Sequence, residues 1–330
     1  MRIVSFFAGL VIIFFCARPV QAQINKDYAF SLCPQFGLFY GHVEEMVYPT
    51  DTKADLLSLL LWDIKPVFYY GFLMDFSPVR PMEKNGFFLD LSMKYGVPGP
   101  SGVMEDRDWL SKQNTELTNF SSHDNITKEI FQLDFSAGFS FPFSRTLLVK
   151  TFVNISYMNF RFYGENGYGI YARETPPYSG IYAPIDDDPA KITYNGLGKL
   201  ISYRQEWFCA APGFSIGYGY KDLFLAEISY MITPLVLCTD FDEHYYNYIG
   251  GTQYGDNMKG GIMIEPGFKF SLNVNRRLGV SFEISWRYIS GTRGPSYYRR
   301  PIGFGSYIQS GEAGAGMSML NTALLLKVKL

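Results

Sequence analysis

Residues 146–163 read TLLVKTFVNISYMNFRFY, and the alternation within them decides the fold. In an extended strand successive side chains point to opposite faces, so every second residue shares a face. One face would carry Val149, Thr151, Val153, Ile155, Tyr157, Asn159 and Arg161. The other would carry Leu148, Lys150, Phe152, Asn154, Ser156, Met158, Phe160 and Phe162. The stretch is therefore predicted to be a β-strand, with imperfect alternation where it leaves a lipid layer.

Similar segments recur along the chain, and ten can be marked. They cover about 28–47, 57–76, 86–101, 128–142, 146–163, 197–219, 223–240, 259–274, 278–291 and 313–330. Short turns are expected at 141–144, 220–222 and 275–277, and long loops at about 102–127, 164–196, 241–258 and 292–312. This asymmetry is typical of outer-membrane barrels, whose short turns face the periplasm and whose long loops face outward.

The composition agrees with a membrane barrel. Aromatic residues make up 18% of the chain, and Gly is abundant at 32 residues. No second long apolar segment follows the N-terminal one, which argues against a helical membrane protein. We therefore predict an all-β fold, a ten-stranded antiparallel transmembrane β-barrel with extended extracellular loops, closed by 313–330. A passive porin is disfavoured, because a wide aqueous channel needs about 16 strands.

The N-terminus resembles a secretory signal in its pattern. Arg2 precedes an apolar stretch from Ile3 to Cys16, and small residues flank a cleavage point after Ala22. We expect a signal peptide at 1–22 and a barrel at 23–330; a signal anchor is the weaker alternative, because the apolar stretch is short for a spanning helix. Removing Arg2 and Arg18 takes 29 basic residues to 27, against 31 acidic ones, a net charge of −4. Nucleic acid is therefore an unexpected partner.

Polar residues gather at the predicted outer end of the barrel. With both termini in the periplasm, the first, third and seventh strands run outward. Their outer ends carry Glu45, Asp106, Asp108, Asp240, Asp242 and His244. These residues are far apart in sequence, yet strand parity brings all of them to one rim.

Two of these groups have the i, i+2 spacing that places side chains on one face of a strand. Asp242 beside His244 would orient the imidazole and raise its basicity, which suits a general base acting on water. Asp106 and Asp108 would repel each other, so at least one should have a raised pKa and the pair could hold a water. By spacing alone, a polar loop is the more economical interpretation of each group, and the aspartate pair could also bind Ca²⁺.

Together with their neighbours, these residues resemble the omptins, a family of outer-membrane proteases with a ten-stranded barrel. MEDRDW at 104–109 is similar to the family's aspartate pair followed by tryptophan. DFDEHY at 240–245 is similar to its Asp-x-Asp-Glu-His-Tyr motif, and EMVY at 45–48 to its Glu-x-Val-Tyr. Residues 157–161 and 202–205 add weaker similarity, and the last third of the chain matches by pattern only.

The resemblance implies a catalytic role for four of these residues. Asp242 and His244 would be the dyad that activates a water molecule. Asp106 and Asp108 would position that water and stabilise the tetrahedral intermediate, without a covalent acyl-enzyme. The implied activity is that of an aspartic-type endopeptidase, a hydrolase at the bacterial cell surface.

The resemblance also implies a substrate class. Glu45 and Asp240 match acidic residues that select a basic side chain before the scissile bond, and recessed carboxylates favour Arg or Lys through charge-assisted hydrogen bonds. The expected partners are peptides or proteins with basic, including dibasic, sites. His123 is similar to a loop histidine of the family and receives only a supporting role.

One part of the chain departs from the family pattern. Omptins bind lipopolysaccharide through a basic cluster on the outer wall and need it for activity. Tyr157 and Arg161 match part of that cluster, but Asn159 replaces an expected glutamate and Glu206 stands where an arginine is expected. No Lys or Arg occurs in 241–258, where a further contact would fall. We therefore expect weak or absent dependence on lipopolysaccharide, since a site short of cations binds phosphates poorly.

No metal or other cofactor is expected besides that lipid activator. The chain has three histidines and lacks CxxC spacing, which argues against a zinc site. The acidic run 186–188 could bind Ca²⁺, although a solvated loop explains it more simply. The alternative to a protease is a non-catalytic barrel of the same fold, an adhesin or host-protein receptor.

Overall fold

The computed structural model describes residues 27–48, 55–221, 223–245, 252–275, 277–299 and 308–329. The predicted signal peptide at 1–22 and its cleavage point lie outside them. The strands in chain order are β1 (Tyr28–Tyr48), β2 (Ser58–Pro78), β3 (Gly86–Gly96), β4 (Gly99–Asp108), β5 (Asn119–Pro142), β6 (Leu147–Tyr171), β7 (Ala190–Thr193), β8 (Lys199–Tyr220), β9 (Phe224–Thr233), β10 (Val236–His244), β11 (Thr252–Lys259), β12 (Ile262–Asn273), β13 (Leu278–Ser290), β14 (Gly294–Arg299) and β15 (Ile308–Lys329).

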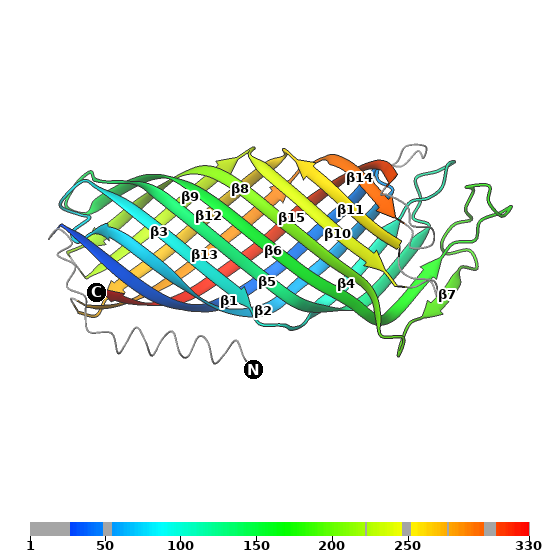
Figure 1. Cartoon of the computed structure of the whole chain (residues 1–330), viewed down its shortest axis with the longest axis horizontal. Coiled ribbons are helices and arrows are strands. Elements are labelled where there is room, and N and C mark those ends of the chain that lie inside the picture. Colours follow the sequence, from blue (N-terminus) through cyan, green and yellow to red (C-terminus); the bar gives the residue numbers. More distant parts are fainter. Residues whose placement is uncertain are drawn as a thin grey trace.

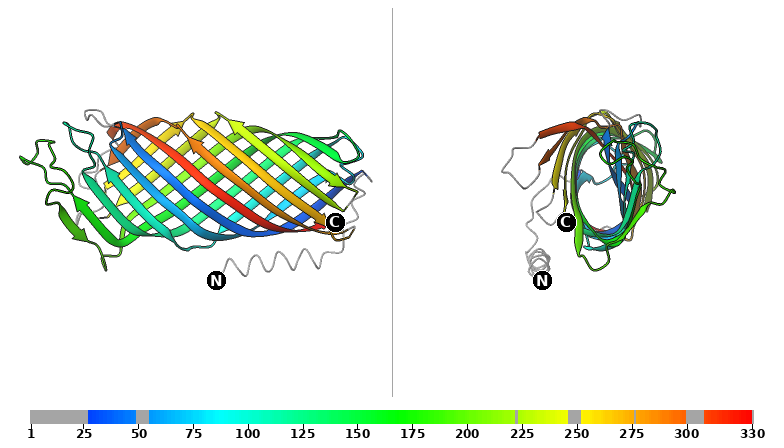
Figure 2. Two further views of the ribbon diagram at one scale, coloured as in Figure 1. Left: turned by 180° about the vertical axis from the view of Figure 1, so that it is seen from behind. Right: turned by 90° about the vertical axis from the view of Figure 1, so that its right-hand side faces the viewer.

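These strands form one antiparallel sheet that closes on itself, because β15 pairs with β1 on one side and with β13 on the other, and β6 pairs with β8. β3 with β4, β9 with β10, β12 with β11 and β13 with β14 each make one wall strand, and β7 extends the sheet beyond β6. The wall described by the structure therefore has ten strands, as predicted, and Figure 2 shows the ring end-on. No helix long and apolar enough to cross a membrane occurs among the residues described.

Four wall strands are each broken once, at 97–98, 234–235, 260–261 and 291–293. Pro234 lacks the amide that a continuous ladder would need. Gly260 and Gly261 have φ values of 78° and 76°, a left-handed conformation that favours glycine. These bends divide each wall strand into a lower and an upper part.

The long loops are shorter than predicted, because strands occupy part of the stretches assigned to them. Strands β4, β10, β11 and β14 lie inside or run into the stretches predicted as loops, and β6 continues to Tyr171. Among the described residues, the longest connection is the one from β6 to β8 that carries β7, which projects from the right-hand end in Figure 1. The upper strands were missed because their outer faces are polar, so they lack the apolar alternation that marks the lower wall.

The two faces of β6 agree with the predicted alternation. Val153 and Ile155 are exposed on the outer surface, whereas Ser156 and Met158 are buried inside. Exposed apolar side chains from other strands continue an outer apolar band, among them Phe36, Phe68, Phe139, Phe208, Ile216, Ile228, Leu237, Phe268, Phe282 and Leu324. This is the lipid-facing surface of a transmembrane barrel.

A layer of packed side chains fills the barrel interior close to the upper ends of β2 and β8. Trp62 of β2 stacks on Phe162 of β6 and Tyr203 of β8, with ring centroids 5.7 Å and 5.3 Å apart. Because β2 and β8 are well separated around the ring, this stack crosses the interior. All three side chains are at most 2% exposed, so the layer closes the barrel with aromatic rings.

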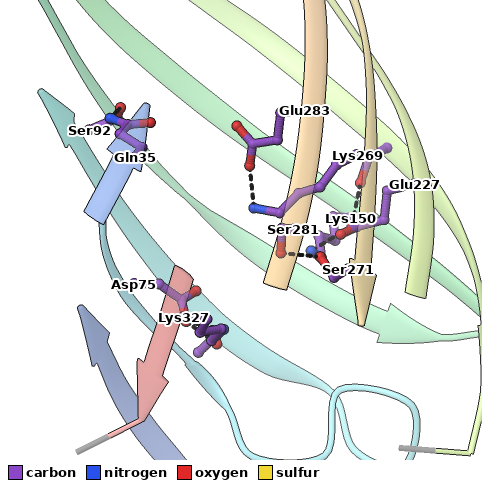
Figure 3. A network of polar contacts seen from close by, with 12 residues as sticks. Gln35, Asp75, Ser92, Lys150, Glu227, Lys269, Ser271, Ser281, Glu283 and Lys327 are labelled. Carbon is purple, nitrogen blue, oxygen red and sulfur yellow. Dashed lines mark hydrogen bonds and ion pairs between the residues drawn. The ribbon is translucent and has the colours of Figure 1, made fainter. Parts of the chain in front are cut away.

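Below the aromatic layer, toward the short turns, the interior becomes polar. Arg287 of β13 bridges the interior to Asp134 of β5, at 3.2 Å, and also pairs with Glu265. Further down, Lys150–Glu227, Lys269–Glu283 and Lys327–Asp75 form ion pairs of 2.6 Å each (Figure 3). They surround a cavity of about 980 Å³ at the turn end of the barrel.

The opposite end of the barrel rises above the apolar band. On β10, Leu237 is exposed at the upper edge of that band and Asp242 follows five residues later. At about 3.3 Å per residue this separation is roughly 16 Å along the tilted strand. The upper parts of β4, β10 and β11 therefore stand outside the membrane, and they carry the site.

Candidate active site

The upper strands, not loops, position the predicted catalytic residues. Asp106 and Asp108 end β4, while Asp242 and His244 end β10. β4 is held between β2 and β5, and β10 between β8 and β11. Side chains at i and i+2 share a face, so each pair points into the barrel mouth as one unit.

Asp242 and His244 are in direct contact. The imidazole Nε2 lies 2.5 Å from Asp242 Oδ2, and Asp242 is buried. Burial of the ring opposes its protonation, but Asp242, and next Asp106 and Asp108, outweigh that effect and raise the pKa of His244 to about 9. The expected carboxylate–imidazole dyad is therefore present, with Nδ1 as the remaining ring nitrogen.

Asp106 and Asp108 are half-buried at the end of β4. Burial first, and then the charge of Asp108, raise the pKa of Asp106, while the hydrogen bond that Ser58 donates at 3.2 Å acts against the rise. Burial also raises the pKa of Asp108, although Asn119 donates a hydrogen bond to it at 3.2 Å. The expected repulsion between the two carboxylates therefore contributes to the raised pKa of Asp106, whereas burial is what raises the pKa of Asp108.

The two pairs line a single cavity of about 330 Å³. Glu45 and Ser58 line it from β1 and β2, and Tyr254 from β11. His244 packs edge-on against the Tyr254 ring, with centroids 5.5 Å apart. Groups from five strands therefore meet around one space at the upper end of the barrel.

Next to this cavity lies a cluster of three buried carboxyl groups, which we call the acidic trio: Glu45, Asp240 and Asp256. One oxygen atom of each lies within 4.8 Å of the others. Burial, and then the neighbouring carboxylates, raise the pKa of Glu45 and of Asp240. Glu45 and Asp240 thus come together as the sequence suggested, and Asp256 joins them.

Asp256 was missed because it falls in a stretch predicted as a loop. It lies directly opposite Asp240 in the β10–β11 ladder, so both carboxyl groups point inward. Burial raises the pKa of Asp256 to about 6. Only the strand register reveals this residue, since the sequence gives no partner for Asp240 across the ladder.

A chain of hydrogen bonds supports the trio from below. Tyr203 donates to Asp240 Oδ2 at 3.1 Å, and Gln205 donates to the Tyr203 hydroxyl at 2.8 Å. Gln205 also donates to the backbone oxygen of Glu44, at 2.9 Å, and accepts from Trp207 Nε1. The chain ties β8, β10 and β1 together beneath the cavity and fixes the position of Asp240.

His123 also lines the cavity, from β5. Its Nδ1 lies 2.7 Å from the Asn166 backbone oxygen and its Nε2 lies 3.1 Å from Ser121 Oγ. Burial lowers its pKa. Both ring nitrogens are engaged, which agrees with the supporting role expected for this residue rather than with a proton-transfer role.

The residues expected to bind lipid lie on the outer wall. Tyr157 donates to Glu206 at 2.7 Å, and Arg161 lies 3.8 Å from Glu129. Arg204, which the sequence analysis did not weigh, lies 3.7 Å from Glu206. Each arginine at this position therefore faces a carboxylate of the same wall.

Comparison with known proteins agrees with this arrangement. The model of the omptin family matches residues 26–329. A plasminogen activator of Yersinia pestis is 23% identical over 256 residues, 75% of each chain. The crystal structure of outer membrane protease OmpT from Escherichia coli has a TM-score of 0.78 and 18% identity, covering 92% of this chain and 97% of that one, which shows that the fold is shared.

Proposed function

The chain belongs to the omptin family, and we propose from this membership that it is an outer-membrane endopeptidase. The observation that carries the proposal is the cavity lined by both the Asp242–His244 dyad and the Asp106–Asp108 pair. The cavity lies beyond the apolar band, at the end opposite the short turns. We place that end on the extracellular side of the bacterial outer membrane, because outer-membrane barrels keep their short turns in the periplasm.

The dyad supplies the base in the proposed mechanism. Asp242 engages Nε2 of His244, which leaves Nδ1 to accept a proton from a water molecule in the cavity. The water attacks the scissile carbonyl directly, and His244 returns the proton to the leaving amine. No covalent acyl-enzyme forms, so the enzyme is a hydrolase of the aspartic type.

The aspartate pair faces the other side of that water. Because both pKa values are raised, the pair retains a proton more readily than isolated carboxyl groups. A protonated carboxyl can donate a hydrogen bond to the oxyanion that develops in the tetrahedral intermediate. Ser58 and Asn119 hold the two carboxyl groups in place.

Substrate selection follows from Glu45 and Asp240. Buried carboxylates beside the cavity favour an Arg or Lys side chain before the scissile bond. We therefore propose cleavage at basic, including dibasic, sites in peptides or proteins. The name of the Yersinia pestis relative points to a protein substrate in that case.

The test is a fluorogenic peptide assay on refolded protein, with an Arg-Arg site and a matched Gln-Gln peptide. Asp242→Asn should lower kcat by about 10²- to 10⁴-fold, the usual contribution of a general base. Glu243→Gln is the matched control, because Glu243 is the next residue on β10 but binds Tyr245 and Gln253 outside the cavity. It should leave kcat within about twofold.

The same assay separates the alternatives. Absence of turnover by the wild type in every detergent and lipid would favour an adhesin or receptor. Equal turnover by Asp242→Asn and the wild type would refute the residue assignment but not the activity. Cleavage of the Gln-Gln peptide at the Arg-Arg rate would refute the role of Glu45 and Asp240.

We further propose that lipopolysaccharide or another outer-membrane lipid contributes little to activation. The support is the pairing of Arg161 with Glu129 and of Arg204 with Glu206, which leaves these cations less available to phosphate groups. Refolded protein free of lipopolysaccharide should then be active. A large stimulation by added lipopolysaccharide would contradict this.

A further inference from the structure

The acidic trio contains more carboxyl groups than one basic side chain can pair with. Asp240 and Asp256 lie directly opposite each other in the β10–β11 ladder, and like charges at such positions destabilise a sheet. Glu45 adds a third carboxyl group from β1. Among the ion pairs of the described residues, none includes a member of the trio.

Several oxygen atoms of the trio also lack hydrogen-bond partners, although Asp240 Oδ2 accepts one from Tyr203. Glu45 Oε2 and both carboxyl oxygens of Asp256 are buried without a hydrogen bond of standard geometry, although Ser296, the Tyr297 amide and the Asp240 carboxyl group lie close enough to favour the charged form of Asp256. The side chains of Glu45, Asp240 and Asp256 are 4%, 7% and 2% exposed. Buried, unpaired carboxylate oxygens are costly unless a cation accompanies them.

The spacing and depth of these atoms suit a small ion. Oxygen ligands lie about 2.3–2.6 Å from a Ca²⁺ ion, so one ion can contact several oxygens that are close together. The trio's oxygens all fall within 4.8 Å of one another. Glu45 lines the cavity, and the carboxyl groups of Asp240 and Asp256 lie next to it, close enough for one ion to reach all three.

We propose that Glu45, Asp240 and Asp256 bind one hard divalent cation, such as Ca²⁺ or Mn²⁺. The three carboxylates supply three oxygen ligands, and water from the cavity completes the coordination shell. An all-oxygen set of this kind favours Ca²⁺ or Mn²⁺ over softer metals. The effect on activity rests on the proposed function. The cation competes with the basic side chain of a substrate for Glu45 and Asp240, so it acts as a competitive inhibitor.

Binding is tested without any assay of activity. Refolded protein, stripped with EDTA, is titrated with Mn²⁺ and the free ion is followed by electron paramagnetic resonance. We expect one bound Mn²⁺ per chain with a Kd of about 0.1–1 mM, displaced by Ca²⁺. Asp256→Asn should weaken binding at least about tenfold.

A matched control distinguishes the trio from other acidic groups. Asp187 belongs to the exposed acidic run 186–188, and Asp187→Asn should leave Mn²⁺ binding unchanged. Asp256→Asn removes a like charge from the trio, so it should fold and melt at the same or a higher temperature in EDTA. Loss of binding in Asp187→Asn but not in Asp256→Asn would overturn the proposal, as would the absence of bound Mn²⁺ up to about 10 mM.

Kinetics then test the competition. Ca²⁺ should raise KM for an Arg-Arg peptide in the wild type and leave kcat unchanged, and Asp256→Asn should be less sensitive. Metal binding without competition would support the site and refute the assignment of Glu45 and Asp240 to the substrate. A protein without protease activity would still show the Mn²⁺ signal, so the two proposals fail separately.

Discussion

His244 is the residue whose environment most directly sets the chemistry. Its ring is balanced between burial, which favours the neutral form, and the carboxyl groups of Asp242, Asp106 and Asp108, which favour the charged form. The charges prevail and place its pKa at about 9. In the proposed mechanism the base must be neutral to accept a proton, so at neutral pH most of the protein would be in the protonated form that cannot act as the base.

The first prediction concerns this titration. Below a pKa of about 9, the neutral fraction of His244 falls tenfold per pH unit, so kcat/KM should rise between about pH 6 and pH 9 with a slope near one. The measurement is a pH profile of kcat/KM with a peptide whose charge is constant over this range. A midpoint near or below about 6.5, the ordinary value for histidine, would contradict it.

The residues of the site differ in how far the sequence reveals them. Asp242 and His244 can be recognised because their spacing places them on one face of any strand. Glu45 and Asp240 were paired only through the family resemblance, since no local spacing connects β1 with β10. Asp256 could not be predicted, because its contact with Asp240 depends on the register of two strands.

At the scale of the elements, the bends in the wall strands matter most. Gly260 and Gly261 separate β11 from β12, and their positive φ values are nearly equal. A Cβ at Gly261 would lie 2.2 Å from the Ser290 backbone oxygen, whereas a Cβ at Gly260 would meet no atom within 4 Å. An alanine at position 260 would therefore suffer backbone strain alone, whereas an alanine at position 261 would suffer both backbone strain and a steric clash.

The second prediction uses that difference. Gly260→Ala should lower the free energy of unfolding by about 1–2 kcal/mol, the cost of a left-handed conformation for alanine. Gly261→Ala should lower it by about 1–3 kcal/mol more, because β11, β12 or β13 must also shift. Urea unfolding in detergent micelles measures both. Equal losses would show that Ser290 moves freely out of the way.

The third prediction concerns the outer wall of β5, β6 and β8. The double variant Glu129→Gln with Glu206→Gln removes the carboxylates beside Arg161 and Arg204. Its affinity for lipopolysaccharide should rise about tenfold. This change corresponds to about 1.4 kcal/mol of binding free energy, which two freed guanidinium groups can supply through hydrogen bonds to phosphate. Retention of radiolabelled lipopolysaccharide on immobilised protein measures it.

A matched pair at the other end of the barrel provides the control. Arg80 and Glu83 form an ion pair of 3.1 Å on the turn side. Glu83→Gln should therefore leave lipopolysaccharide binding unchanged. An equal gain from this variant would mean that net charge, rather than the wall of β6 and β8, governs binding.

The elements themselves were predictable only where they contact lipid. Lower strands such as β6 up to Phe162 alternate apolar with small or polar residues, and the sequence marks them. Above the band both faces of a strand can be polar, so β4, β11 and β14 resemble loops in sequence. These segments form strands because their backbones pair with neighbouring strands, β4 with β2 and β11 with β14, and such pairing cannot be read from one segment alone.

At the scale of the whole molecule, the barrel is a closed container. Along β2 the inward side chains run from Ser58 and Leu60 at the upper cavity, through Trp62, to Leu73 and Asp75 at the lower cavity. The aromatic layer and the Arg287 bridge separate the two cavities. Strand number and parity predicted the closed ring, but what fills it depends on packing between distant strands.

The fourth prediction follows from this filling. Refolded protein inserted into a planar lipid bilayer should show no unitary conductance at about 100 mV, because no continuous water path crosses the aromatic layer. The comparison is a porin of about 16 strands under the same conditions. Stable conductance steps from the wild-type protein would show that the layer opens.

The aromatic layer beneath the catalytic cavity has a kinetic consequence. A site closed from below has a single entrance, so both halves of a cut peptide must leave by the path along which the intact chain arrived. Under the proposed cleavage, the half that ends in the basic residue would carry a new carboxylate beside the four acidic side chains of the cavity, Glu45, Asp106, Asp108 and Asp242. Repulsion between this carboxylate and the acidic side chains should speed product release. Binding of the next substrate, rather than product release, should then limit turnover.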